Sequence, residues 1–361
     1  MSEQKLKIGI TQGDHNGIGL EVIIKTFLDP QMLEICIPVL FGSQKTFSHH
    51  RKALNVDMRF TSVRSAEMAV LKQLNIVNVY EEDIPVDFGM STPAGGKYAL
   101  KSIETACEAL EQNKIHALVT APINKHNIQL QEFSATGGPA SGWQFKGHTD
   151  YLEMRFKKPA LMLMCADKFR VGIVTGHVPI ANVSAIISQE KIVQKIQAMN
   201  KALIEDFGIR KPKIAVLGLN PHAGDSGVIG TEEQSVIIPA IVKAKTEGIF
   251  VMGPYSADGF FGNNTHEKFD GVLAMYHDQG LIPFKTIAFE TGVNYSAGLP
   301  IVRTSPDHGV GYDIAGKNQA NESSFRSAVY LACDIVKTRK QEKEITANPL
   351  KALSKNEREF G

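Results

Sequence analysis

The chain of 361 residues has the composition of an ordinary globular protein, with 43% hydrophobic and 21% charged residues. Its 39 Lys and Arg residues nearly balance 38 Asp and Glu residues, which leaves a formal net charge of +1 at pH 7. This balance excludes a global field that would recruit nucleic acid or an anionic membrane, so any recognition of anions must be local.

The cysteines and the N-terminal stretch indicate a reducing compartment. Four cysteines without CxxC spacing are predicted to be reduced core residues: Cys36, Cys107, Cys165 and Cys333. The start, MSEQKLKIGIT, fits neither a signal peptide nor a membrane span. We therefore expect a soluble cytoplasmic protein with no membrane partner.

Apolar runs of strand length recur along the chain, each bounded by Gly, Pro or polar residues. In order they are KIGIT (7–11), IPVLFG (37–42), HALVTAP (116–122), ALMLMCAD (160–167), FRVGIVTG (169–176), KIAVLGLNP (213–221), IFVMGP (249–254), DGVLAMY (270–276) and IVRTS (301–305). Helical patterns lie between them at 98–114, 183–208 and 232–248, and the lysine-rich 337–361 is predicted to be a solvated terminal helix. This alternation predicts an α/β protein with largely parallel sheets.

The residues that directly follow these runs are the candidates for chemistry, because ligands of open α/β sheets bind at the carboxyl ends of the strands. They are Gly13, Asp14, Thr120 to Lys125, His177, Asn220, His222, Asp258, His277 and Asp278. Residues 131–147 are rich in Gly, Ser and Ala and contain the only tryptophan, Trp143. This segment is predicted to be a linker or a mobile loop over a site.

Three of the eleven histidines follow strand-like runs at the predicted functional edge: His177, His222 and His277. Each alone is most simply a hydrogen-bonded histidine at a strand end. Together they suit a divalent metal with open positions, zinc first, with cobalt, nickel, manganese, magnesium or iron as alternatives. Asp258 and Asp278 are predicted to be acid–base groups or partners of the metal ligands, and their simpler interpretation is a turn or helix-cap aspartate.

Two further groups of residues suit anions. Lys285, Asn294 and Arg303 are predicted to bind a phosphate or carboxylate, and GHTD adds His148 and Thr149. The Gly-rich TQGDHNGIGLE (11–21) precedes a helical pattern, so its amides could bind an anion, or it could be only a tight strand-to-helix turn.

The most specific segment is SPDHGVGYDIAGKNQAN, residues 305–321. It resembles the His-Gly loop and the following Asp-Ile-Ala-Gly-Lys of the isocitrate and isopropylmalate dehydrogenase group, whose nucleotide site is not a Rossmann fingerprint. Six further motifs agree with a single family: GDHNGIGLEVIIK, VTAPINK, GHTDYLE, GLNPHAGDSG, AMYHDQGLIPFK and VNYSAGLPIVRTSPDHG. Taken with this segment, they show that residues 7–321 resemble the 4-hydroxythreonine-4-phosphate dehydrogenase family of vitamin B6 biosynthesis.

The resemblance implies an isocitrate/isopropylmalate dehydrogenase-like fold of two α/β/α domains that flank a cleft. Residues 1–130 plus 295–361 would form the nucleotide-binding domain, and residues 131–294 the substrate, metal and dimerisation domain. It also implies a homodimer whose active sites lie at the subunit interface and take metal ligands from both subunits.

The resemblance also assigns roles to single residues. A metal would be held by His177, His222 and His277, and a phosphorylated substrate by His148, Thr149, Lys285, Asn294 and Arg303. The nucleotide would lie against His308, Gly309, Asp313 and Asn318. A carboxylate at position 313 would accept the ribose hydroxyls and repel a 2′-phosphate, so NAD is favoured over NADP.

The implied reaction is NAD-dependent oxidation of 4-phosphooxy-L-threonine at C3, followed by decarboxylation to 3-amino-2-oxopropyl phosphate. Three alternatives stay open: a related dehydrogenase of 4-phosphothreonate or 4-phosphoerythronate, a three-histidine metal hydrolase or lyase without nucleotide, and a non-catalytic phosphometabolite-binding protein.

The chain departs from the family pattern in the Gly-rich turn 11–21, where His15, Asn16 and Leu20 replace two prolines and an alanine. It also has Asp150 where Glu is common, and a longer stretch before Gly147.

Overall fold

The computed structural model describes residues 5–129 and 147–348. The segment predicted to be a linker or loop, apart from Gly147, lies outside these residues, and so does the end of the lysine-rich tail. All four cysteines are buried and free, which confirms the prediction of reduced core residues.

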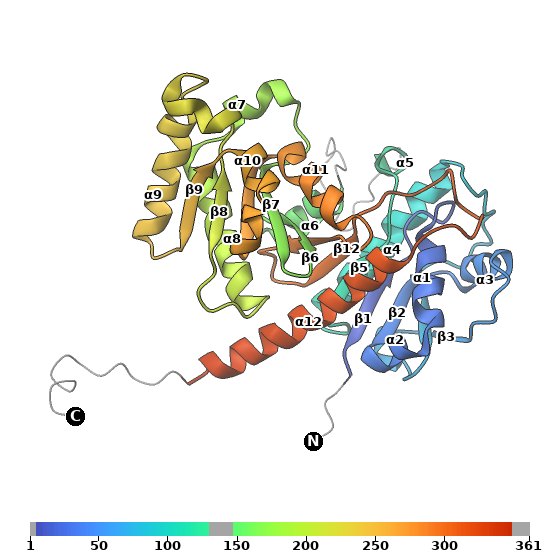
Figure 1. Ribbon diagram of the computed structural model, residues 1–361. Coiled ribbons are helices and arrows are strands. Elements are labelled where there is room, and N and C mark those ends of the chain that lie inside the picture. Colours follow the sequence, from blue (N-terminus) through green and yellow to red (C-terminus); the bar gives the residue numbers. More distant parts are fainter. Residues whose placement is uncertain (1–4, 130–146, 349–361) are drawn as a thin grey trace.

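The described strands form one sheet of twelve, in the order β3-β4-β2-β1-β5-β12-β11-β6-β7-β10-β8-β9. Each of the nine predicted runs contains a strand (Figure 1). The strands are β1 Lys7–Thr11, β2 Ile37–Gly42, β3 Phe60–Val63, β4 Leu74–Asn78, β5 Ala117–Thr120, β6 Leu161–Ala166, β7 Phe169–Thr175, β8 Ile214–Leu217, β9 Val251–Tyr255, β10 Gly271–Tyr276, β11 Val293–Ala297 and β12 Arg303–Pro306.

The prediction of largely parallel pairing is confirmed by both flanks of the sheet, and the centre is the exception. The pairs β11–β12, β11–β6 and β6–β7 are antiparallel. Only Asp167 and Lys168 separate β6 from β7, and Asp167 has a left-handed φ of 48°. A two-residue connection allows only an antiparallel hairpin, whereas a parallel pair needs a long crossover.

Several helices begin at a residue whose side chain caps the first turn. Thr92 accepts the amide of Gly95 ahead of α4, and Ser188 accepts the amide of Lys191 ahead of α8, which divides the predicted 183–208 segment in two. The helices are α1 Gly19–Leu28, α2 Pro30–Ile35, α3 Gln44–Ala53, α4 Pro93–Glu111, α5 Lys125–Gln129, α6 His148–Phe156, α7 Val183–Ile186, α8 Gln189–Glu205, α9 Ile238–Thr246, α10 Ala257–Gly262, α11 His277–Ala288 and α12 Ser323–Thr346.

Helix α12 crosses the middle of the molecule, between the half that contains β1 to β5 and the half that contains β6 to β10 (Figure 1). Its first half is buried through Phe325, Val329 and Ile335, while residues beyond 337 are mostly exposed. The α/β class is therefore confirmed, and the division into domains near 130 and 295 stays a prediction. None of the described helices combines the length and the apolar character needed to cross a bilayer.

Candidate functional site

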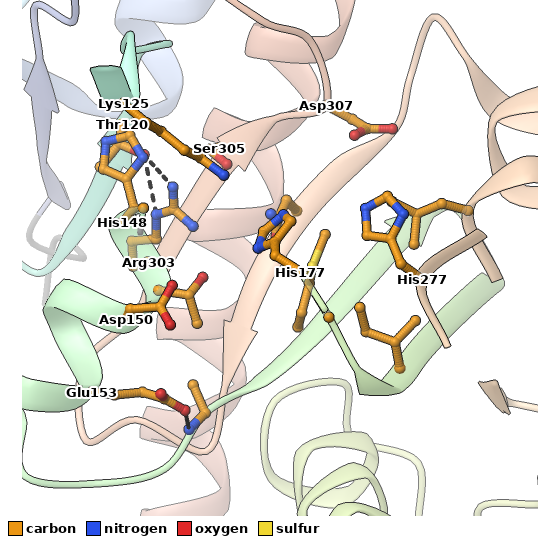
Figure 2. Close-up of a pocket in the computed structure, with 18 of the residues that line it drawn as sticks. Thr120, Lys125, His148, Asp150, Glu153, His177, His277, Arg303, Ser305 and Asp307 are labelled. Carbon is orange, nitrogen blue, oxygen red and sulfur yellow. Dashed lines mark hydrogen bonds between the residues drawn. The ribbon is translucent and has the colours of Figure 1, made fainter. Parts of the chain in front are cut away.

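A pocket of about 670 Å³ lies beyond the carboxyl ends of β5, β7, β10 and β12 (Figure 2). This is the edge at which the sequence predicted a site. Nine predicted site residues line the pocket: His148, Thr149, His177, His277, Lys285, Asn294, Arg303, His308 and Gly309. The side chains of Lys125, Asp150, Glu153 and Asp307 join them.

Arg303 is a buried cation whose partners are neutral. It is 2% exposed, and its guanidinium donates to the Thr120 hydroxyl at 3.1 and 2.6 Å and to the Ser296 hydroxyl at 3.2 Å. No carboxylate pairs with it among residues 5–129 and 147–348. Burial lowers the pKa of Arg303 to about 9, so the group is still charged at pH 7. A buried charge without a counter-ion is a site for an anion.

His148 and Asn294 present buried polar atoms to the same pocket. His148 Nε2 and Asn294 Oδ1 have no hydrogen-bond partner within the described part of the chain. Burial lowers the pKa of His148 well below its usual value, and the charges of Arg303 and Lys125 lower it further. His148 is therefore a neutral imidazole at pH 7 with one nitrogen available to a ligand.

Lys125, to which the sequence analysis assigns no role, also lines the pocket near Arg303 and His148, as Figure 2 shows. It is the first residue of α5 and follows β5 in VTAPINK. The signal that could have found it is its position beyond a strand end, since Thr120 to Lys125 were among the residues singled out there.

His177 and His277 lie together at the other end of the pocket, with ring centroids 5.6 Å apart. Burial lowers the pKa of His177, with Lys125 and His277 adding to the effect. The Asp278 carboxylate lies 2.7 Å from His277 Nδ1, which leaves Nε2 of His277 for another contact. The imidazoles of His177 and His277, the second of which is oriented by a carboxylate, are suitable metal ligands.

His222 and Asp258 lie outside the pocket. His222 is exposed in η3, Pro221–Gly227, with a left-handed φ of 54°, and it does not line the pocket. The Asp258 carboxylate accepts the Ser256 hydroxyl, a contact that lowers the pKa of Asp258, and the charge of His222 acts on it in the same direction. Accordingly, no three His, Cys, Asp or Glu side chains in the described segments are grouped to hold a metal.

Lys285, which is predicted to bind the phosphate, has a partner that the sequence analysis missed. Lys285 Nζ lies 3.2 Å from Asp307 Oδ1, and burial raises the pKa of Asp307 while Lys285 lowers it. Asp307 directly precedes the His-Gly pair in SPDHG, which was the available signal. Of the predicted nucleotide residues, His308 and Gly309 reach the pocket, whereas Asp313 and Asn318 are exposed outside it.

The amides of the Gly-rich turn are engaged within the protein. The amide of Asp14 donates to the Pro122 carbonyl, and the amides of Asn16 and Gly17 donate to Asp14. Residues 11–20 are all buried. The structure thus favours the tight-turn alternative over an anion site built from these amides.

The fold and the pocket define an α/β protein with a cationic site suited to a small anionic ligand. The family model described as pyridoxal phosphate biosynthetic protein PdxA matches residues 34–332, and the chain belongs to that family. This confirms the resemblance deduced from the motifs.

The chain is 50% identical, over 97% of its length and 94% of the relative, to a 4-hydroxythreonine-4-phosphate dehydrogenase of Bacteroides thetaiotaomicron. It is 37% identical, over 92% of its length and 98% of the relative, to an Oceanobacillus iheyensis protein provisionally named D-threonate 4-phosphate dehydrogenase. The crystal structure of 4-hydroxythreonine-4-phosphate dehydrogenase from Klebsiella pneumoniae superposes with a TM-score of 0.79 at 29% identity, covering 93% of this chain and 99% of that one.

Proposed function

We propose that the protein is a 4-hydroxythreonine-4-phosphate dehydrogenase. It oxidises 4-phosphooxy-L-threonine at C3 with NAD, and the β-keto acid formed loses CO2 to give 3-amino-2-oxopropyl phosphate for pyridoxal phosphate biosynthesis. The observation that carries the proposal is Arg303, a buried cation without a carboxylate partner among the described residues, in a pocket that also contains Lys285 and His148. The Bacteroides relative, at 50% identity, supports the same activity.

The phosphate group suits the cationic and polar residues that line the pocket. Arg303 offers guanidinium donors, Lys285 a point charge, and His148 a ring nitrogen. Thr149 lies beside them, with its Oγ1 3.5 Å from the Ser296 hydroxyl. Asn294 Oδ1 is an acceptor and needs a group that donates a hydrogen bond, so we assign it to a hydroxyl or ammonium of the substrate.

The metal proposal rests on the adjacent rings of His177 and His277 and on the lowered pKa of His177, which together suit a divalent cation such as zinc. The third ligand would be the partner's His222, because this residue is exposed and does not line the pocket of its own chain. When bound, the metal supplies a Lewis acid that lowers the pKa of the C3 hydroxyl. Asp278 orients His277, and Asp258, whose pKa the His222 charge lowers, would accompany His222 as the acid–base residue.

A homodimer is supported by apolar side chains on the half of the molecule that carries His222. Val228 is 80% exposed, Ile180 72% and Phe289 67%. Exposed apolar residues of this size suit a surface that another subunit would cover. Val228 directly follows η3, so covering it would bring the η3 segment to the partner.

The nucleotide proposal assigns NAD to the segment that begins at His308 and Gly309, with Asp313 at the ribose hydroxyls. His308 Nε2 is buried and has no partner within the described residues. Burial lowers the pKa of His308, so the ring is neutral at pH 7, and its Nε2 can make a hydrogen bond to the nucleotide. NAD supplies the hydride acceptor.

The test is NADH formation by the metal-loaded protein with 4-phosphooxy-L-threonine and with D-threonate 4-phosphate. The pocket carboxylates Asp150, Glu153 and Asp307 favour the α-ammonium group of the first substrate over a neutral hydroxyl. We expect kcat/KM at least about tenfold higher for 4-phosphooxy-L-threonine, a difference of roughly 1.4 kcal/mol. The opposite preference would establish the second candidate, the D-threonate 4-phosphate activity that the Oceanobacillus relative's name suggests. No NADH with either substrate would refute both.

A further inference from the structure

The buried segment Thr11–Glu21 supports the proposed nucleotide segment, residues 308–321, at three points. The amide of Ile18 donates to the Val310 carbonyl at 2.9 Å, and the Tyr312 hydroxyl donates to Asp14 Oδ2 at 2.7 Å. The amide of Ala320 donates to Glu21 Oε1 at 2.9 Å. The Gly-rich turn therefore serves as the base on which the nucleotide segment rests.

Gly17 makes this close approach possible. A Cβ atom at this position would lie 2.2 Å from Val310 Cγ1 and 2.6 Å from the Val310 carbonyl oxygen. Contacts this short do not occur, so any side chain at position 17 would push the two segments apart.

Asp14 also connects this base to the anion end of the pocket. The same Oδ2 atom that accepts Tyr312 accepts Asn127 Nδ2 at 2.7 Å, and Oδ1 accepts the Asn16 amide at 2.9 Å. Asn127 belongs to α5, whose first residue is the pocket residue Lys125. One fully buried carboxylate thus joins the nucleotide segment to the helix that carries Lys125.

We propose that Asp14 is a positioning residue that holds Tyr312 and α5 in one arrangement, so that nucleotide binding and anion binding near Lys125 depend on the same carboxylate. The inference rests on the proposed function, because it takes 308–321 as the nucleotide segment. Hydrogen bonds to a carboxylate are stronger than those between neutral groups, and three donors converge on this one. Asparagine has the same shape but only one acceptor oxygen. Because that oxygen must accept the Asn16 amide, as Oδ1 does, the amide nitrogen of Asp14→Asn takes the place of Oδ2, and Tyr312 and Asn127 lose the acceptor that they share.

The experiment measures the Kd of NADH by fluorescence titration and the KM of the phosphorylated substrate for four variants. Tyr312→Phe removes one donor and is expected to raise the Kd of NADH about 3- to 10-fold with little change in substrate KM. Asn127→Leu is expected to raise substrate KM and leave the Kd of NADH unchanged. Asp14→Asn is expected to raise both, and Tyr330→Phe, on the surface of α12, is the matched control that changes neither.

Coupling through one carboxylate predicts non-additivity. In the Asp14→Asn background, Tyr312→Phe should raise the Kd of NADH by less than about twofold further, since its acceptor is already lost. Additive effects of the two changes would overturn the inference. If Asp14→Asn fails to fold, an unchanged Kd of NADH in Tyr312→Phe overturns it alone. Absence of NADH binding by the wild-type protein would instead refute the proposed dehydrogenase function.

Discussion

The buried Arg303 and the partly buried Arg339 differ in the groups that face their guanidinium ions. Arg339 Nε lies 2.6 Å from Asp206 Oδ1, whereas Arg303 faces only hydroxyls among the described residues. Because an unpaired buried charge destabilises the fold, we expect Arg303→Met to keep or raise the melting temperature. The same change should lower the affinity for phosphorylated substrate by about 30-fold or more, since charge-assisted hydrogen bonds contribute roughly 2 kcal/mol or more.

Arg339→Met is the matched comparison, measured by the same thermal and urea unfolding. It leaves the buried Asp206 without its cation, and breaking such a pair costs about 3–5 kcal/mol of unfolding free energy. Substrate KM should change little, because Arg339 does not line the pocket. If Arg303→Met were as destabilising as Arg339→Met, Arg303 would be a structural residue and not an anion-binding one.

At the scale of elements, the sequence predicted the strongly apolar strands and missed those with mixed polarity. β3 (FTSV), β4 (LNIVN) and β11 (VNYSA) carry polar residues that interrupt the apolar run. In β11 the interruption comes from function, because Asn294 lines the pocket and the Ser296 hydroxyl accepts from Arg303. A strand that carries polar site residues therefore lacks the continuous apolar run from which a strand is predicted.

The site shows the same division. Residues that follow apolar runs or belong to recognised motifs could be predicted, as Arg303 and His277 were. For Lys125 and Asp307 the only signal is a position beside a strand end or the His-Gly pair, because a single charged residue has no periodicity and its neighbours in the fold are distant in the sequence. His222 follows an apolar run as His177 and His277 do, so no local pattern could predict that it lies outside the pocket.

Helix α3 is anchored to the Gly-rich turn by a histidine whose protonation should make stability depend on pH. His50 Nε2 lies 2.7 Å from the His15 carbonyl oxygen, and burial lowers the pKa of His50 from 6.5 to about 4. The folded protein therefore keeps His50 neutral at pH values where the unfolded chain binds a proton. Stability is complete above about pH 6.5 and falls as the pH drops towards about 4, by roughly 3 kcal/mol for this residue.

Urea unfolding between pH 7.5 and 4.5 measures this effect, and His50→Gln should flatten the curve. The slope will not vanish, because burial also lowers the pKa of His15, His148 and His308. His49→Gln, exposed on the same helix, is the control and should leave the wild-type slope unchanged. An equal slope in His50→Gln and wild type would show that His50 does not contribute to the pH dependence.

At the scale of the whole molecule, the proposed metal ligands divide into two sets. His177 and His277 face each other in one pocket, whereas His222 is exposed in η3 beside the apolar Val228. A two-fold symmetric dimer can bring η3 of each subunit to the pocket of the other, since both copies present the same surfaces. The active site would then be complete only in the dimer.

Subunit complementation tests this arrangement. His222→Ala and His277→Ala homodimers should each be inactive, because every site lacks a ligand. A heterodimer of the two contains one site with all three histidines, so an equal mixture that exchanges subunits should recover about a quarter of wild-type activity. Mixing His177→Ala with His277→Ala is the control and should recover nothing, because both changes lie on the same side of the site and each heterodimer site stays defective. If mass spectrometry shows heterodimers of the first pair and activity does not return, each metal site is built from a single chain.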